Sequence, residues 1–281
     1  MTSCIMKDCA LVYTIPKKEI TKIDFALCKQ PKETLEQFYN RQEIKPDLLC
    51  NGGFFNVNDG ATIFNFVDNG NWISSSTTYV DGFGIKNNTF EFSNKPSDYS
   101  EFISAYPVLI KNGKEITTNS ATEINYKARR TVLAYDTNNI YLILVKAPGM
   151  LFPALKQLLL ELKVDFAINL DGGGSTRCLE KGVLATETAY SRPVDNVVCF
   201  YLRTIYRVQI GAYSKRANAE KMLAEIKTLP DIIGAGYKNA YIRLINGLYK
   251  VQVGAFSKRE NAQKVVNDLK FKGYSSFISL K

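Results

Sequence analysis

The sequence predicts an α+β protein of two domains: a larger domain over residues 1–204 built on a mixed sheet, and a small βαββαβ sandwich over residues 205–281. Three observations predict this organisation. β-rich runs dominate the larger part, strand and helix patterns repeat in the smaller part, and the charge balance differs between the two. With 281 residues, of which 46% are hydrophobic, the chain is long enough to bury a core in each part.

The larger part contains many runs of β-branched and aromatic residues and few stretches with helical spacing. The clearest strand-like runs are residues 11–15, 22–27, 131–135, 141–146, 166–170 and 196–202. Helical spacing is clear from Pro31 and again from Phe152, where Pro153 suits the first turn of a helix. A substantial sheet with few helices is typical of the α+β class.

The smaller part repeats itself. Y-R-V-Q-I-G-A-Y-S-K-R-A-N-A-E-K from Tyr206 returns 43 residues later as Y-K-V-Q-V-G-A-F-S-K-R-E-N-A-Q-K from Tyr249. Each copy alternates as a strand does, breaks at Gly-Ala and then has helical spacing. A-Y-I-R-L-I and S-S-F-I-S-L predict two further strands. The order βαββαβ predicts a split-βαβ sandwich with four strands in one layer.

The two parts differ in charge. Residues 1–204 contain 22 Lys+Arg and 22 Asp+Glu, whereas residues 205–281 contain 14 and 5, so the net charge of +9 belongs to the small domain. A basic domain suits an anionic partner. For any single basic cluster, such as residues 214–216, the alternative to a binding role is a basic surface that only contributes to solubility.

Several function classes are excluded or disfavoured by composition. The chain has no histidine, which removes Ser-His-Asp and Cys-His catalysis and leaves carboxylates, Lys, Arg, Tyr, Asn and backbone amides for any chemistry. Its six cysteines form no C-x-x-C pair, which favours reduced core thiols over a zinc site. No apolar run reaches the roughly 18–20 residues of a membrane span, and the first residues lack a secretory signal. We therefore expect synthesis in the cytoplasm.

The repeated motif carries a family resemblance. V-Q-I-G-A-Y-S and V-Q-V-G-A-F-S, each followed by N-A and a lysine, resemble a SPOR domain over residues 205–281. The resemblance implies a module that binds peptidoglycan glycan strands lacking stem peptides, with the sheet face as the groove. We expect the glutamine amides to point out of the strands toward sugar groups and the aromatic rings to stack on sugars, although one ring can equally belong to the core. The predicted glycan-binding residues are Gln209, Tyr213, Ser214, Gln252, Phe256 and Ser257.

The larger part contains four motifs, each of which alone is weak evidence of function, whereas all four together are specific evidence. They are N-G-G-F-F-N at 51–56, A-R-R-T at 128–131, N-L-D-G-G-G-S-T at 169–176 and R-P-V-D-N at 192–196. In this order they resemble the phosphodiester glycosidase family over most of residues 10–202. The resemblance implies removal of N-acetylglucosamine from a sugar phosphodiester by cleavage between the anomeric carbon and the phosphate oxygen. K-A-P-G at 146–149 and A-T-E-T-A-Y at 185–190 depart from the family pattern, which leaves the distal sugar open.

The chemistry of such a reaction assigns roles to these residues. A phosphodiester is already a good leaving group, so the site needs cations on the phosphate, a carboxylate near the anomeric carbon and close backbone donors. Asp171 is the predicted base or charge stabiliser, and Arg130 and Arg192 are the predicted phosphate clamp. The predicted substrate-binding residues are Asn51, Gly52, Gly53, Asn56, Thr131, Asn169, Gly172, Gly173, Gly174, Ser175, Thr176 and Asn196.

Two alternatives remain open at this site. Asp171 can instead cap its own loop in an Asx turn. No cofactor is predicted, but a divalent cation such as Ca²⁺ at the Asp and Asn cluster is a second possibility.

Together these features predict a hydrolase of the cell wall. It would cleave a glycosyl-1-phosphodiester and be anchored to peptidoglycan through a short joint at residues 202–205, with glycan strands and anionic wall polymers as partners. Without a signal peptide it would reach the wall after lysis, as a phage or prophage lysis protein does, or after mother-cell lysis in a sporulating Gram-positive bacterium.

Two other function classes compete with this prediction. One is a non-catalytic wall protein that only recognises sugar phosphates. The other is an RNA-binding protein, because a basic split-βαβ sheet is also the RNA-recognition architecture. The small domain has one aromatic per half and lacks the K/R-G-F-x-F pattern, which disfavours RNA.

Overall fold

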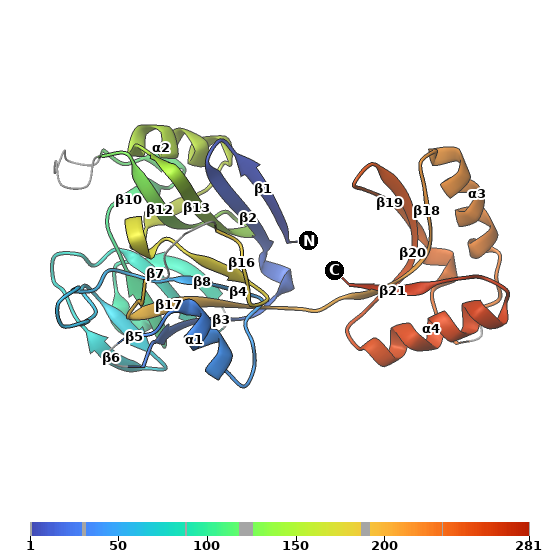
Figure 1. Cartoon of the computed structure of the whole chain (residues 1–281), viewed down its shortest axis with the longest axis horizontal. Helices are drawn as coiled ribbons and strands as arrows, with labels where there is room; N and C mark the ends of the chain where they lie inside the picture. Colours follow the sequence, from blue (N-terminus) through green and yellow to red (C-terminus); the bar gives the residue numbers. More distant parts are fainter. Residues whose placement is uncertain are drawn as a thin grey trace. The chain divides into compact units, whose positions relative to one another are not determined.

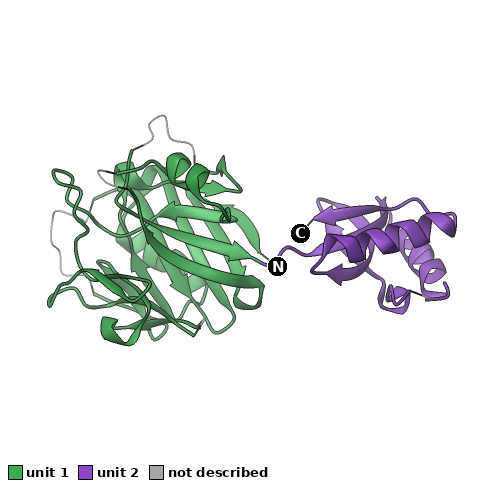
Figure 2. Cartoon of the chain, turned by 90° about the horizontal axis from the view of Figure 1, so that it is seen from below, with its two compact units in different colours: residues 1–202 green, residues 203–281 purple. Residues whose placement is uncertain are grey.

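The computed structural model describes residues 2–29, 32–87, 89–117, 126–186, 192–231 and 233–280. The chain divides into two compact units, unit 1 (Met1–Leu202) and unit 2 (Arg203–Lys281) (Figure 2). The sequence placed this boundary two residues further on, between 204 and 205. Within the described ranges, no helix has the length and apolar character needed to cross a membrane.

Unit 1 contains three sheets among the described residues. The first has strand order β1-β2-β13-β12-β14-β10-β11, the second β16-β15-β4-β17-β3 and the third β6-β5-β9-β7-β8. The strands of the first sheet are β1 (Ser3–Lys7), β2 (Ala10–Pro16), β10 (Val108–Lys111), β11 (Lys114–Glu115), β12 (Ala128–Tyr135), β13 (Asn139–Met150) and β14 (Phe166–Asn169). Those of the second are β3 (Ile20–Leu27), β4 (Leu48–Asn51), β15 (Cys178–Glu180), β16 (Val183–Leu184) and β17 (Asn196–Leu202). Those of the third are β5 (Phe66–Asp68), β6 (Asn71–Ser74), β7 (Gly82–Lys86), β8 (Thr89–Ser93) and β9 (Glu101–Ser104).

The expected α+β class is confirmed, but strand direction differs from the expected mixed sheet. Every strand pairing among the described residues is antiparallel. The reason is visible at β13 and β14, which helix α2 (Phe152–Glu161) connects. β12 lies between these two strands and pairs with both, so the strands that the helix joins never become neighbours.

The main core lies between the three sheets. Leu133 and Ile168 from the first sheet, Phe25 from the second and Phe83 from the third are all buried in one cluster. The other face of the first sheet packs under α2, where Val132 lies in a second cluster. Successive residues of β12 therefore alternate between these two cores, as a strand buried on both faces requires.

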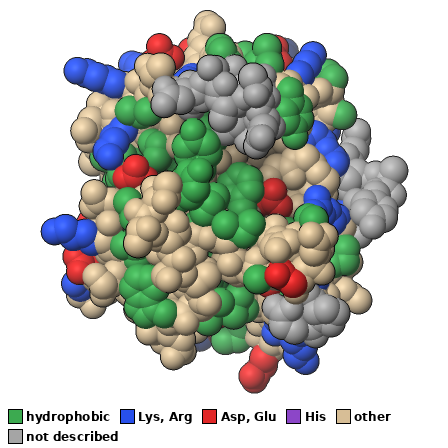
Figure 3. Space-filling model, turned by 90° about the vertical axis from the view of Figure 1, so that its left-hand side faces the viewer, with side chains coloured by type: hydrophobic (Ala, Val, Ile, Leu, Met, Phe, Trp, Pro, Cys, Tyr) green, Lys and Arg blue, Asp and Glu red, His purple; other side chains and the backbone are tan. Residues whose placement is uncertain are grey.

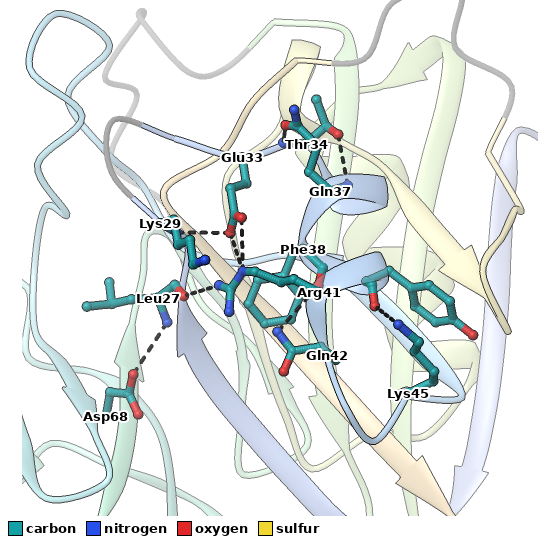
Figure 4. Close-up of polar contacts among 11 residues, drawn as sticks. Leu27, Lys29, Glu33, Thr34, Gln37, Phe38, Arg41, Gln42, Lys45 and Asp68 are labelled. Carbon is teal, nitrogen blue, oxygen red and sulfur yellow. Dashed lines mark hydrogen bonds and ion pairs between the residues drawn. The ribbon is translucent and has the colours of Figure 1, made fainter.

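Helix α1 (Leu35–Arg41) covers the outer face of the second sheet, where Leu35 and Phe38 are buried. It begins with a capping box between Thr34 and Gln37 (Figure 4). Arg41 Nε donates to Glu33 Oε2 at 2.8 Å and Arg41 Nη2 to the Leu27 carbonyl at 3.2 Å, which ties the helix to β3. The helix was expected from Pro31, a position outside the described residues. The second predicted helix begins at Phe152 with a proline in its first turn, as expected.

Unit 2 has the predicted βαββαβ order. Its elements are β18 (Tyr206–Tyr213), α3 (Arg216–Lys227), β19 (Tyr241–Ile245), β20 (Leu248–Phe256), α4 (Arg259–Phe271) and β21 (Phe277–Leu280), shown in orange and red in Figure 1. The four strands form one sheet in the order β19-β20-β18-β21. Val208 and Val253 pack with Ile226 of α3 and Leu269 of α4 in a single core, so both helices cover the same face of the sheet.

Candidate functional site

The candidate site lies where β4 and β14 end, because the polar loops that follow these strands are bonded to each other. The Asp171 amide donates to the Gly52 carbonyl at 3.2 Å, and Asn51 Nδ2 donates to the Asp171 carbonyl at 2.8 Å. The N-G-G and L-D-G-G-G motifs, 120 residues apart in the sequence, are thus held side by side at the junction of the first and second sheets.

Asn51 positions these loops. Its Oδ1 accepts from Thr131 Oγ1 at 2.8 Å and from the Arg177 amide at 3.2 Å, while its Nδ2 also reaches the Gly52 carbonyl at 3.3 Å. The side chain is buried and both ends of its amide are engaged within the protein. Asn51 therefore joins three segments of the site, in contrast to the expected contact with a sugar.

Asn196, on the neighbouring strand, positions the same loops in a similar way. Its Oδ1 accepts from the Gly53 amide at 2.7 Å, and its Nδ2 lies 3.3 Å from Asp195 Oδ2. A Cβ at Gly52 would lie only 2.1 Å from Asn196 Oδ1, so this approach requires glycine. The Asn196 side chain is fully buried, and the predicted contact with a sugar is not available to it in this arrangement.

Asp171 lies at the start of the triple-glycine loop and is a partly exposed residue. Its Oδ1 accepts from the Gly172 amide at 2.8 Å, so the carboxylate does contact its own loop. Burial raises the pKa of Asp171 above its ordinary value, and the Ser175 hydroxyl, the Gly172 amide and the charge of Arg192 each oppose that rise. A carboxylate with a raised pKa beside an arginine is a common feature of catalytic sites.

Arg192 belongs to the same cluster as Asp171. A Cβ at Gly174 would lie 3.4 Å from Arg192 Nη1, which places the guanidinium against the glycine loop. The guanidinium also stacks over the Phe55 ring at 5.3 Å and remains partly exposed. The structure therefore brings together Asp171, the loop of residues 172–174 and Arg192, as the sequence predicted.

The side chain of Arg130 is directed away from this cluster, contrary to its predicted role in a two-arginine clamp. Its side chain is 5% exposed, its Nη2 donates to the Tyr126 carbonyl at 2.7 Å, and its guanidinium covers the Phe152 ring at 4.2 Å. It is thus turned toward α2, whereas Thr131 faces Asn51 on the other side of β12. Arg129 lies where the pairing of β12 with β13 is irregular, between Ala128 and Arg130, and it is partly exposed.

The other predicted residues lie around this cluster. Asn169 is buried at the end of β14, and its Nδ2 donates to the Tyr106 carbonyl at 3.1 Å. Ser175 and Thr176 are buried, with Thr176 Oγ1 lying 3.4 Å from Thr131 Oγ1. Asn56 is further along the loop after β4, where its Oδ1 accepts from the Asn58 amide at 3.0 Å and closes a turn.

Arg177 was missed by sequence reasoning. Its amide donates to Asn51 Oδ1 at 3.2 Å, and its buried guanidinium forms an ion pair with Glu36 of α1. It therefore links the end of the glycine loop to the helix that covers the second sheet. An arginine after G-G-G-S-T is visible in the sequence, but its partner lies 141 residues away and no local pattern points to it.

In unit 2 the two predicted glutamines are not open to solvent. Gln209 is 5% exposed and Gln252 1%, although they pair across β18 and β20 on the face opposite the helices. Arg207 Nε donates to Tyr241 Oη at 3.0 Å, and this contact runs from β18 to β19 across β20, the strand that carries Gln252. The expectation that the amides point freely outward is therefore wrong, because neighbouring side chains cover them.

The predicted aromatics of unit 2 lie on the helix side of the sheet. Phe256 packs against the core, with its ring so close to Gly254 that a Cβ there would meet it at 2.3 Å. Tyr213 covers Gly211 in the same way and lies near Glu225 of α3. Ser214 and Ser257 are exposed just before α3 and α4. On the open face, Tyr241 and Phe277 flank the glutamine pair, and the sequence analysis missed both.

The described residues contain no group of three or more Cys, Asp or Glu side chains arranged to hold a metal ion.

Residues 46–201 match the phosphodiester glycosidase family. The chain belongs to this family. Residues 203–279 match the SPOR domain, so unit 2 is a SPOR domain. A search of curated proteins found no match to the chain.

Two solved structures resemble unit 1 in fold. The catalytic domain of zebrafish N-acetylglucosamine-1-phosphodiester alpha-N-acetylglucosaminidase, auto-inhibited by its pro-peptide, has a TM-score of 0.59 and 19% identity, covering 72% of this chain and 81% of that one. A hypothetical protein from Synechocystis has a TM-score of 0.62 and 14% identity, covering 72% and 61%. At these identities the likeness shows the fold alone.

Proposed function

We propose that the protein is a cell-wall glycosidase that hydrolyses a glycosyl-1-phosphodiester and is held at peptidoglycan by its SPOR domain. One observation carries the proposal: in a chain of this family, the carboxylate of Asp171 and the guanidinium of Arg192 lie at the same glycine loop. A carboxylate and a cation side by side suit a reaction in which positive charge develops on a sugar while a phosphate departs.

The reaction would proceed by attack of water on the anomeric carbon. The bond from that carbon to the phosphate oxygen breaks, and the electron pair leaves with the phosphate. Asp171 would take the proton of the water or stabilise the charge on the sugar ring. Arg192, which stays partly exposed over the Phe55 ring, would hold the phosphate as its charge rises. The amides of the glycine loop can approach the substrate closely because no side chains shield them.

The identity of the sugar that is removed follows from the family resemblance alone, and a phosphodiester of N-acetylglucosamine is the substrate we propose to test first. The SPOR domain implies peptidoglycan binding. Its open sheet face carries Tyr241 and Phe277, whose rings suit sugar faces, with Arg243 and Lys250 in the adjoining row. Tethering a catalytic domain to the wall raises its local concentration there without any new catalytic contact.

The test is turnover of N-acetylglucosamine 1-(methyl phosphate) by the full chain, with Asp171→Asn beside wild type. Asp165→Asn is the matched control, because Asp165 lies just before β14 while Asp171 follows its other end. Loss of turnover in Asp171→Asn alone is the expected result. A wild-type protein that binds the compound without cleaving it would favour the non-catalytic sugar-phosphate-binding alternative.

A second experiment separates wall binding from RNA binding. The full chain is sedimented with amidase-treated peptidoglycan and, in parallel, captured on single-stranded RNA. Retention by peptidoglycan at moderate salt is expected, because sugar stacking is insensitive to screening whereas contact through charge alone weakens. Capture by RNA alone would overturn the assignment of unit 2 to the wall.

A further inference from the structure

Four aromatic rings form a row beside the candidate site. Ring centroids are 5.4 Å apart for Phe54 and Phe64, 4.5 Å for Phe64 and Tyr79, and 5.2 Å for Tyr79 and Tyr106. The rings come from the loop after β4, from the segment before β7 and from the turn before β10. Tyr79, in the middle of the row, is 37% exposed, so part of this residue is open to solvent.

Two cavities adjoin Tyr79. One has a volume of about 510 Å³ and the other about 290 Å³, and Thr78 and Tyr79 line both. The space is of the size that small-molecule sites in proteins occupy, roughly 300–1,000 Å³. Figure 3 views the molecule from the side on which the loops between β4 and β7 lie in Figure 1, and it shows hydrophobic side chains gathered in a hollow, with acidic and basic side chains at its edges.

The lining of the larger cavity combines apolar side chains with uncharged polar ones. Its polar side chains include those of Asn56, Thr62, Ser75 and Ser76, of which Asn56 and Thr62 donate to Asp59 and Asp195, and none of the described residues that line it is acidic or basic. In the smaller cavity the one carboxylate among the lining residues is Asp81, which pairs with Lys111 Nζ at 3.4 Å. Hydroxyl and amide groups beside exposed ring faces suit a neutral ligand that has both hydroxyls and apolar faces, and a pyranose ring has both.

Both ends of the aromatic row are bonded to the candidate site. Phe54 follows Gly53, whose amide donates to Asn196 Oδ1 at 2.7 Å. The Tyr106 carbonyl accepts from Asn169 Nδ2 at 3.1 Å, two residues before Asp171. Thr62, at the wall of the larger cavity, donates to Asp195 beside Asn196. A ligand in these cavities would therefore lie next to the loops that carry the proposed reaction.

We infer that the two cavities bind neutral sugar rings of the glycan that carries the scissile phosphodiester, with Tyr79 as the shared stacking surface. The inference rests on the proposed function and makes it more specific, because it makes an oligosaccharide or polymer the substrate in place of a single sugar phosphodiester. The charge of the lining favours one class of ligand. An anionic ligand would lose its hydration against a lining that has no cations, which costs free energy, whereas desolvation of a neutral sugar costs little.

The experiment is isothermal titration calorimetry of the full chain with di-N-acetylchitobiose. Tyr79→Ala should bind roughly 2- to 10-fold more weakly than wild type through loss of the stacked ring. Tyr79→Phe, which keeps the ring, should bind as wild type does. Tyr79→Leu keeps apolar bulk without a flat face and should resemble Tyr79→Ala, so the result does not depend on whether the alanine variant packs well.

Trp72→Ala is the matched control. Trp72 is an aromatic residue of β6, 50% exposed, and lines neither cavity. Any binding by unit 2 is common to all variants and cancels in the comparison. Equal affinity of wild type and Tyr79→Ala, or no binding by wild type, would overturn the inference. A wild type that binds chitobiose through Tyr79 but cleaves no phosphodiester would leave the sugar site standing and remove the proposed function.

Discussion

The contrast between Arg192 and Arg130 provides a sharp prediction, since the structure gives the two predicted clamp residues different surroundings. Arg192 is partly exposed at the glycine loop, whereas Arg130 is buried over Phe152. Removal of one charge-assisted contact to a departing phosphate costs roughly 2–4 kcal/mol, on the order of 10²–10³ in rate. We therefore expect Arg192→Ala to lose about that much in kcat/KM on a phosphodiester, and Arg192→Lys to recover only part of it.

Arg130→Ala should show the opposite behaviour. It removes a stacked cation and a hydrogen bond from a buried place, which should lower the free energy of unfolding by about 1–3 kcal/mol and leave kcat/KM largely intact. Urea denaturation and steady-state kinetics on both variants measure the two effects. An uncharged aryl glycoside is the control substrate, because it has no phosphate for Arg192 to hold. Equal losses of Arg192→Ala on both substrates, or a loss for Arg130→Ala as large as that for Arg192→Ala, would refute the reasoning.

Three further predictions concern pH and the wall. Burial raises the pKa of Asp171, so kcat/KM should rise with pH through a pKa above that of an ordinary aspartate and then stay flat, since the chain has no histidine; a fall between about pH 6 and 8 would contradict this. Burial, with Asp24 and then Asp68 close by, raises the pKa of Glu101 from 4.5 to about 7. Ionisation of Glu101 then opposes folding, so the free energy of unfolding should fall as pH rises across that window, and Glu101→Gln should flatten the slope. Phe277→Ala should weaken sedimentation with amidase-treated peptidoglycan more than Phe256→Ala does, because only Phe277 lies on the open face. Both variants are compared as folded proteins. A larger loss for Phe256→Ala would show that the glycan binds on the helix side of the sheet.

The sequence was sufficient for the parts of the fold that rest on local pattern. The internal repeat predicted the βαββαβ order of unit 2, and the resemblance to the phosphodiester glycosidase family, carried by the motifs at two strand ends, predicted that the loops at residues 51–56 and 169–176 belong to one site. Hydrogen bonds from Asn51 Nδ2 to the Asp171 carbonyl and from the Asp171 amide to the Gly52 carbonyl bring these loops together. Such predictions succeed because strand ends and turns are determined by neighbouring residues.

What the sequence could not determine depends on pairing between distant segments. In A-R-R-T either arginine could face the site, and only the packing of Arg130 against Phe152 shows that Arg130 faces α2. Gln252 alternates as an exposed residue would, yet Arg207 and Tyr241 from the flanking strands reach across it. The row from Phe54 to Tyr106 unites three separate loops, and no single window of sequence contains it.

The central claim is that the bond from the anomeric carbon to the phosphate oxygen breaks, and isotope labelling tests it directly. Hydrolysis of N-acetylglucosamine 1-(methyl phosphate) by the full chain is run in water enriched in oxygen-18, and the masses of both products are measured by mass spectrometry. The mechanism at Asp171 and Arg192 predicts the label in the sugar hydroxyl at the anomeric carbon and none in methyl phosphate. Label in the phosphate product would show attack at phosphorus, and the chain would then act as a phosphodiesterase in contradiction to this account.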